Sequence, residues 1–85
     1  MKHTGRHIEH IDDLASSIRD ARRGMGATQS ELAGFAGVGV RFVSEVENGK
    51  ETAEVGKVLQ LLQRLGLELW VVPRGGQLPE DDERS

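Results

Sequence analysis

Cysteine is absent from this 85-residue sequence, and so is any long apolar run. Without cysteine the chain can form neither a disulfide framework nor a thiolate metal site, which is compatible with a reducing compartment. No apolar run approaches the roughly 20 residues needed to cross a bilayer, and the N-terminal stretch MKHTGRHIEH lacks the apolar centre of a signal peptide. The sequence therefore predicts one small cytoplasmic domain with no membrane partner.

Residue patterns typical of catalysis and of cofactor binding are missing as well. The chain has no Ser/His/Asp arrangement and no phosphate-binding loop, so we expect neither an enzyme nor a bound cofactor. His3, His7 and His10 are close in sequence, but they lie in a segment without an acidic or cysteine scaffold. We therefore expect no metal site there.

The formal net charge of −3 is unevenly distributed. Residues 1–50 contain seven Lys/Arg and seven Asp/Glu, whereas residues 51–85 contain four and seven. The acidic excess lies mainly in the final stretch PEDDERS, whose composition is typical of disorder. The body of the protein can therefore bind DNA, although without a strong non-specific attraction to phosphate.

Apolar periodicity predicts four helices. Residues 11–21 carry apolar side chains on one helical face, and the stretch ARRGMGA ends that helix. The second helix begins with the capping box Thr28-x-x-Glu31, the third covers VRFVSEVENG, and the fourth is capped by Thr52 and closed by Gly66. The side chains predicted to be buried are Ile11, Leu14, Ala15, Ile18, Ala21, Leu32, Phe35, Ala36, Val38, Phe42, Val43, Val46, Val55, Val58, Leu59, Leu62 and Leu65.

The stretch LGLELWVVPRGG predicts a single β-strand after the last helix. Leu67, Leu69 and Val71 share one face, and Pro73 with the following glycines ends the strand. A lone strand would leave its backbone N–H and C=O groups unpaired, which is costly when they are buried. The sequence contains no second strand to pair with it.

The stretch AGVG between the second and third helices indicates a helix-turn-helix. Small residues, Ala33 and Ala36, allow the two helices to cross closely, and Gly37 permits the reversal. In such a motif the start of the third helix reaches base edges in the major groove. Arg41 and Ser44 are then available as donors to bases, and Val40 can touch a thymine methyl. A bare helical bundle and a merely solvated Arg41 are the less favoured readings.

The stretch TQSELAGFAGVGVRFVSEVENGK resembles the helix-turn-helix of the Cro/lambda-repressor (XRE) family in its TQxELA, AGV and ExGK elements. Together with TAEVGKVLQLLQRLGLELWVVPR, it makes the chain similar to HipB-type antitoxins, the DNA-binding partners of HipA-type kinase toxins. The resemblance implies an all-α, lambda-repressor-like bundle of four to five helices. It also implies that the C-terminal β-strand pairs with its copy in a second subunit, which would supply the missing strand.

The same resemblance assigns roles to individual residues. Gln29 matches a phosphate-contacting position, the third helix supplies the base-reading positions, and its end lies near the flanking backbone. Gly39 departs from the family, which often has Ser or a longer polar residue there, so a cap or contact is lost. The implied DNA-binding residues are Gln29, Ser30, Gly39, Val40, Arg41, Ser44, Asn48 and Lys50, and the implied dimerisation residues are Leu67, Leu69, Trp70 and Val71.

The expected organisation is a flexible N-terminus (1–10), a helix-turn-helix domain (11–66), a dimerisation strand (67–74) and a disordered acidic tail (75–85). The implied function is an antitoxin that binds a pseudo-palindromic operator, represses its own toxin–antitoxin operon and neutralises a HipA-like serine/threonine kinase toxin. Two alternatives stay open: a stand-alone XRE repressor, and a protein-only inhibitor or adaptor with a vestigial helix-turn-helix.

Two further points concern the arginines near the end of the first predicted helix and Trp70. Arg19, Arg22 and Arg23 are more consistent with a helix C-terminal dipole match than with DNA contacts. Trp70 is equally compatible with the core of a dimer and with an exposed anchor for a partner protein.

Overall fold

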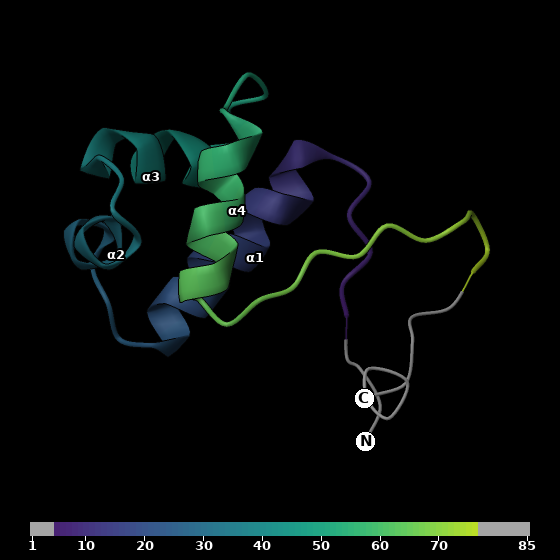
Figure 1. Cartoon of the computed structure of the whole chain (residues 1–85), viewed down its shortest axis with the longest axis horizontal. Coiled ribbons are helices and arrows are strands. Elements are labelled where there is room, and N and C mark those ends of the chain that lie inside the picture. Colours follow the sequence, from purple (N-terminus) through teal and green to yellow (C-terminus); the bar gives the residue numbers. More distant parts are fainter. Residues whose placement is uncertain (1–4, 77–85) are drawn as a thin grey trace.

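The computed structural model describes residues 5–76, and in this range the chain forms four helices and no strand. These are α1 (Ile11–Gly24), α2 (Gln29–Ala36), α3 (Val40–Glu47) and α4 (Val55–Arg64). In Figure 1, α2 and α3 lie on one side of α4, α1 lies behind it, and the chain after α4 leaves the bundle. The prediction of a small all-helical bundle is confirmed.

Local hydrogen bonds explain where α2 begins, and packing explains α4. Thr28 Oγ1 accepts from the Glu31 amide at 3.0 Å, and Glu31 Oε1 accepts from the Thr28 amide at 2.9 Å, so the predicted capping box is confirmed. The predicted cap at Thr52 is wrong, because the N-cap of α4 is Glu54, which makes no side-chain cap bond. Burial of one face therefore stabilises α4 in place of a cap.

Each helix is followed by a glycine with positive φ: Gly26, Gly37, Gly49 and Gly66. At the end of α3, the amide of Gly49 donates to Val46 O at 3.0 Å and that of Lys50 to Glu45 O at 3.1 Å, which is a Schellman motif. A Cβ at Gly49 would collide with the Asp12 carboxylate of α1. The Asp12 side chain could move aside, so it is the positive φ of 82° that requires glycine at the end of α3.

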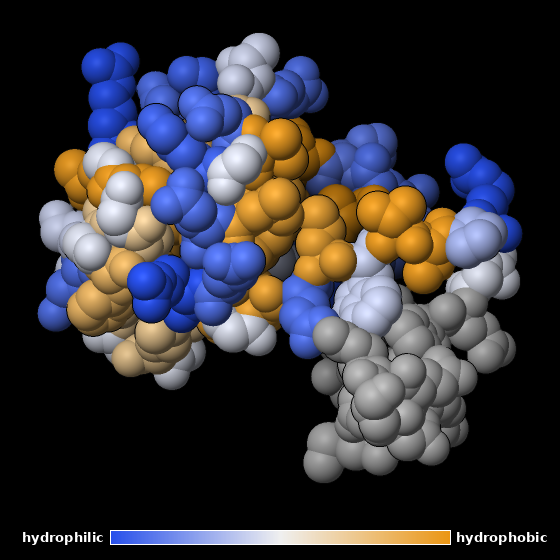
Figure 2. Space-filling model, in the orientation of Figure 1, coloured by the Kyte–Doolittle hydropathy of each residue, from blue (hydrophilic) through white to orange (hydrophobic). Residues whose placement is uncertain are grey.

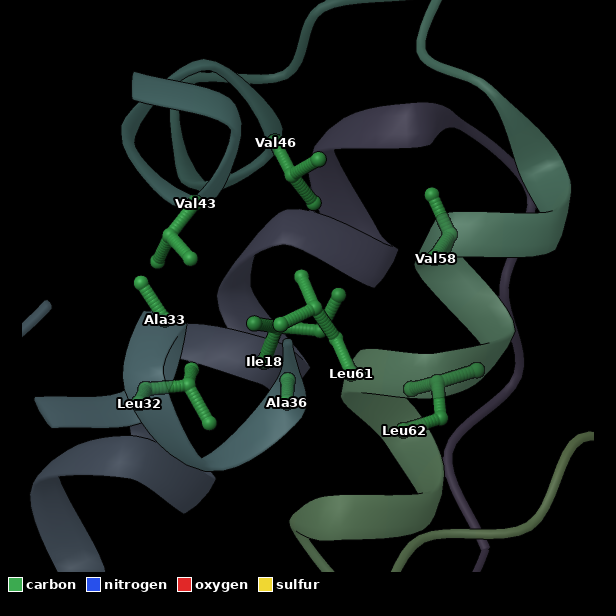
Figure 3. Close-up of a cluster of buried hydrophobic side chains, with 9 residues drawn as sticks. All are labelled: Ile18, Leu32, Ala33, Ala36, Val43, Val46, Val58, Leu61 and Leu62. Carbon is green, nitrogen blue, oxygen red and sulfur yellow. The ribbon is translucent and has the colours of Figure 1, made fainter. Parts of the chain in front are cut away.

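The core is formed by apolar side chains from all four helices (Figure 3). Ala33 points toward Val43 across the α2–α3 crossing, as expected from its small side chain. The same view places Ile18 of α1 and Leu61 of α4 at the centre of the cluster, and both are fully buried. The cluster consists of Ile18, Leu32, Ala33, Ala36, Val43, Val46, Val58, Leu61 and Leu62.

Three residues predicted to be buried are exposed. Phe35 is 55% exposed because the buried face of α2 is centred between Ala33 and Ala36, under α3 and α4, and Phe35 lies beyond its edge. Val55 and Leu59 are exposed because α4 buries Val58, Leu61 and Leu62 instead. Leu61, which was not predicted, completes the i, i+3, i+4 face.

The segment after α4 contains the predicted dimerisation strand, but it has no regular secondary structure in the single chain. Leu67 packs against the core, whereas Leu69 is 50% exposed and Val71 is 94% exposed. A β-strand needs a second strand for its hydrogen bonds, and the prediction placed that strand in another subunit. The strand and its pairing therefore stay predictions.

The segment before α1 is irregular from residue 5 to 10 but is attached to the helices. Arg6 forms an ion pair with Asp20 at 3.3 Å, and Asp13 Oδ2 accepts from the amides of Glu9 and His10 at 3.0 Å each. These two backbone donors hold the pKa of Asp13 below its ordinary value. His3 and most of the predicted acidic tail lie outside the described residues.

Within residues 5–76, no helix is long and apolar enough to span a membrane. In the same range, no three His, Asp or Glu side chains lie together in a way that could hold a metal ion.

Candidate nucleic-acid interface

Helices α2 and α3 form the predicted helix-turn-helix. Gly37 has φ of 71° and ψ of 31°, in the left-handed region, and the Val38 amide donates to Ala33 O at 3.1 Å across the turn. This reversal presses Val43 and Val46 of α3 into the core. The start of α3 is consequently left on the surface.

The predicted DNA-binding residues lie at the start of α2, along α3 and just after α3. Gln29 is half-buried and Ser30 exposed on α2, while Ser44 is half-buried and Asn48 is the C-cap of α3. Arg41, Ser44 and Asn48 are spaced i, i+3 and i+7, so they share one helical face. The other members, Gly39, Val40, Arg41 and Lys50, are all exposed.

Gly39 is the N-cap of α3, and no side-chain cap bond is present there. A Cβ built on Gly39 would meet no atom within 4 Å. The sequence departure at this position therefore removes a cap without being required by packing. It leaves Arg41, whose side chain is 90% exposed, as the long cation at the start of α3.

A buried carboxylate ties the helix-turn-helix to α1. The Glu47 side chain is 3% exposed and receives two hydrogen bonds from Arg22, Nε to Oε2 at 2.6 Å and Nη2 to Oε1 at 2.9 Å. Gln29 Nε2 donates to Glu47 Oε1 at 3.0 Å, and Arg19 Nη1 donates to Glu47 O at 2.9 Å. Arg22 Nη1 also donates to Ala27 O at 2.8 Å, so one pair joins α1, α2, α3 and the α1–α2 turn.

The surroundings of both partners shift their pKa values in the directions that favour the ionised pair. Burial raises the pKa of Glu47, but the hydrogen bonds from Arg22 and Gln29, with the charges of Arg22 and Arg19, outweigh it and leave the pKa below its ordinary value. The hydrogen bonds to Glu47 raise the pKa of Arg22 against the opposing effect of burial. Glu47 is therefore a carboxylate at neutral pH.

This network was not predicted from the sequence. Arg19 and Arg22 were expected to match the α1 dipole, whereas their side chains reach α3. The available signal was the position of Glu47, which follows Val43 by four residues on the buried face of a short helix. A charged residue there requires a buried partner of opposite sign.

A second carboxylate of α3 lies on the exposed side. Glu45 Oε2 is 3.4 Å from Arg41 Nε, and Glu45 Oε1 is 3.3 Å from Lys50 Nζ. Two of the predicted DNA-binding cations are thus paired with one anion in the free protein.

A family model described as "Helix-turn-helix" matches residues 18–69, which include α2, the turn, α3 and α4. The chain belongs to this XRE-type helix-turn-helix family. The match begins within α1 at Ile18, one of the core residues, so it covers the entire two-helix motif together with most of its hydrophobic support.

One curated relative and several solved structures are similar to the chain. The HTH-type transcriptional regulator y4mF of Sinorhizobium fredii (strain NBRC 101917 / NGR234) is 46% identical over 70 residues, covering 82% of this chain and 92% of the relative. A solved HipA–HipB–O2–O3 complex and a HipB–O4 20mer complex each match with a TM-score of 0.74 and 28% identity, over 81% of this chain and 97% of theirs.

These similarities agree with the geometry of α2 and α3. The protein is a DNA-binding helix-turn-helix transcriptional regulator of HipB-like architecture.

We predict that Glu47→Gln lowers the free energy of unfolding by about 3 kcal/mol at pH 7, because it leaves Arg22 buried without its anion. Folding lowers the pKa of Glu47. The contribution of its carboxylate to the free energy of unfolding is therefore complete above the pKa of the unfolded state, and it is lost as pH falls through the pKa of the folded state. The difference between variant and parent should therefore shrink below about pH 4. Urea unfolding followed by circular dichroism at several pH values measures it.

The matched control is Glu45→Gln on the same helix, where both ion pairs are solvent-exposed and should contribute less than about 1 kcal/mol. Equal destabilisation by the two variants, or a difference at Glu47 that does not change with pH, would contradict the central role of this pair.

Proposed function

We propose that this protein is a HipB-type antitoxin: it represses its own operon from a pseudo-palindromic operator and neutralises a HipA-like serine/threonine kinase toxin by forming a complex with it in the cytoplasm. The observation that carries the proposal is the exposed α3 surface of a helix-turn-helix, on a fold that matches HipB chains over 81% of this one. HipB occurs in a solved HipA–HipB–O2–O3 complex and in a solved HipB–O4 20mer complex.

The positions of the side chains support the proposed DNA-binding roles. Arg41 and Ser44 donate to base edges, and Val40 contacts a thymine methyl. Gln29 and Ser30, at the start of α2, contact phosphates, and Gly39 allows close approach of the α3 backbone. Asn48 and Lys50 contact the flanking phosphates at the other end of α3.

We predict that Arg41→Ala weakens binding to the DNA upstream of the operon by about 1–3 kcal/mol and relaxes the preference at one guanine, since guanidinium pairs with guanine O6 and N7. Gel-shift titration against the operator and single-base variants measures both effects. Arg64→Ala, which removes the same charge from the last turn of α4, is the control and should bind normally.

Unchanged affinity and base preference in Arg41→Ala would remove this residue from the interface. If the parent protein itself does not bind the upstream DNA, the adaptor with a vestigial helix-turn-helix becomes the better account.

Apolar side chains left on the surface support the proposed dimerisation. Figure 2 shows apolar side chains continuing from α4 into the segment after it. Leu69 and Val71 are exposed in the single chain, and Trp70 between them is half-buried. Leu67, at the start of this segment, packs against the core. Antiparallel pairing of residues 67–72 with a second copy would cover these side chains and supply the ladder hydrogen bonds.

We predict that Leu69→Asp converts the dimer to a monomer in analytical ultracentrifugation, because a carboxylate would be buried at the apolar pairing face. Met25→Asp is the matched control: Met25 and Leu69 are both 50% exposed, but Met25 lies in the turn after α1. A dimeric Leu69→Asp protein would exclude this strand as the interface.

The kinase partner is tested with the product of the neighbouring gene. A twofold dimer presents two identical surfaces, so we predict two kinases per antitoxin dimer in light scattering of the co-expressed proteins. The alternative is a stand-alone repressor, favoured by the similarity to y4mF, which is described only as a transcriptional regulator. A neighbouring product that is not a kinase, or that forms no complex, would favour that alternative.

A further inference from the structure

We infer that Glu45 is a specificity-determining residue of this DNA interface. In the free protein its carboxylate forms ion pairs with Arg41 and Lys50. It gives up these ion pairs only where it can accept a hydrogen bond from the amino group of a cytosine. The inference rests on the proposed function, because it concerns the same α3 surface, but none of the positions assigned to DNA from the sequence includes it.

The geometry around Glu45 divides one carboxylate between two cations. Oε2 lies 3.4 Å from Arg41 Nε, one helical turn earlier, and Oε1 lies 3.3 Å from Lys50 Nζ, just after the helix. The backbone fixes the second pair, because the Lys50 amide donates to Glu45 O in the Schellman motif. Glu45 is therefore held between the two cations by the helix and by its C-terminal cap.

Glu45 is the carboxylate of α3 whose charge reaches the outer surface. The other carboxylate of the helix, Glu47, is buried and neutralised by Arg22. Glu45 is 33% exposed and faces outward with Arg41 and Lys50, so this part of the surface carries two positive charges and one negative charge. The Arg41 and Lys50 side chains are 90% and 46% exposed, so a DNA phosphate can reach both. The nearby carboxylate repels that phosphate and offsets one of the two positive charges, which weakens non-specific binding.

The chemistry of base edges defines when this displacement is favourable. A carboxylate only accepts hydrogen bonds, and the cytosine N4 amino group is the donor that Glu pairs with in the major groove. Arg41, one turn away, matches guanine. A half-site with a G·C pair near Arg41 and a cytosine near Glu45 provides partners for the side chains of Arg41, Glu45 and Lys50. A random site leaves the Glu45 carboxylate facing hydrogen-bond acceptors or phosphates.

The test is the salt dependence of binding by Glu45→Gln, compared with the parent protein, on operator DNA and on random-sequence DNA of equal length. We expect the variant to bind random DNA more tightly, with a slope of log K against log salt steeper by about 0.9 for each cation released to a phosphate. The operator-to-random affinity ratio should fall about tenfold, the scale of losing one base contact. Glu54→Gln, at the exposed N-cap of α4, removes the same charge and should change neither quantity.

A second measurement identifies the base. Replacing each G·C pair of the half-site in turn by A·T should reveal one position at which the parent loses affinity and Glu45→Gln does not. An unchanged slope and ratio in Glu45→Gln, or no such position, would overturn the inference and reduce the two ion pairs to supports of α3. A parent protein that does not prefer the operator over random DNA would instead contradict the proposed function itself.

Discussion

The ion pair between Arg22 and Glu47 is the interaction on which the rest of the structure depends. It lies at the junction of α1, α2 and α3, and Gln29 and the backbone of Ala27 complete its hydrogen bonds. Burying two charges is expensive, and an apolar pair could be equally stable, so what the pair adds is geometry. A bidentate contact fixes direction as well as distance, and it holds the end of α3 against the start of α2.

This arrangement explains how a small domain holds the short helix α3 in a defined position. Within residues 5–76 the central cluster contains nine buried apolar side chains, and α3 is eight residues long. Such a helix is marginal by itself. Its position comes from Val43 and Val46 in the core, from Glu47 at its end and from Gly49 beside α1. With one face fixed in this way, Arg41 and Glu45 remain on the other face, where the proposed DNA contacts lie.

The charges of α3 are thus divided into two sets by burial. Glu47 is permanently paired, and its pKa is lowered accordingly. Glu45 is paired with exposed cations at longer distances, where exchange with another ligand costs little. Two glutamates two residues apart on one short helix therefore have different environments, because a helix turns each residue toward a different side. Glu47 is structural, whereas Glu45 has the exposed position from which we propose it acts in recognition.

Local chemistry in the sequence determined the helices, the capping box at Thr28, the glycine turns and the helix-turn-helix, since each depends on residues within a few positions of one another. The candidate roles of Val40, Arg41 and Ser44 followed from the same spacing, whereas those of the other candidate DNA-binding residues came from the resemblance to the family. Only the tertiary structure decided that Phe35 and Leu59 lie outside and Leu61 inside, and that Arg22 reaches Glu47 across 25 positions. An apolar stripe gives a helix a buried side, but the helices packed against it choose which of its edge residues are covered, and a long side chain finds its partner only after the helices have met.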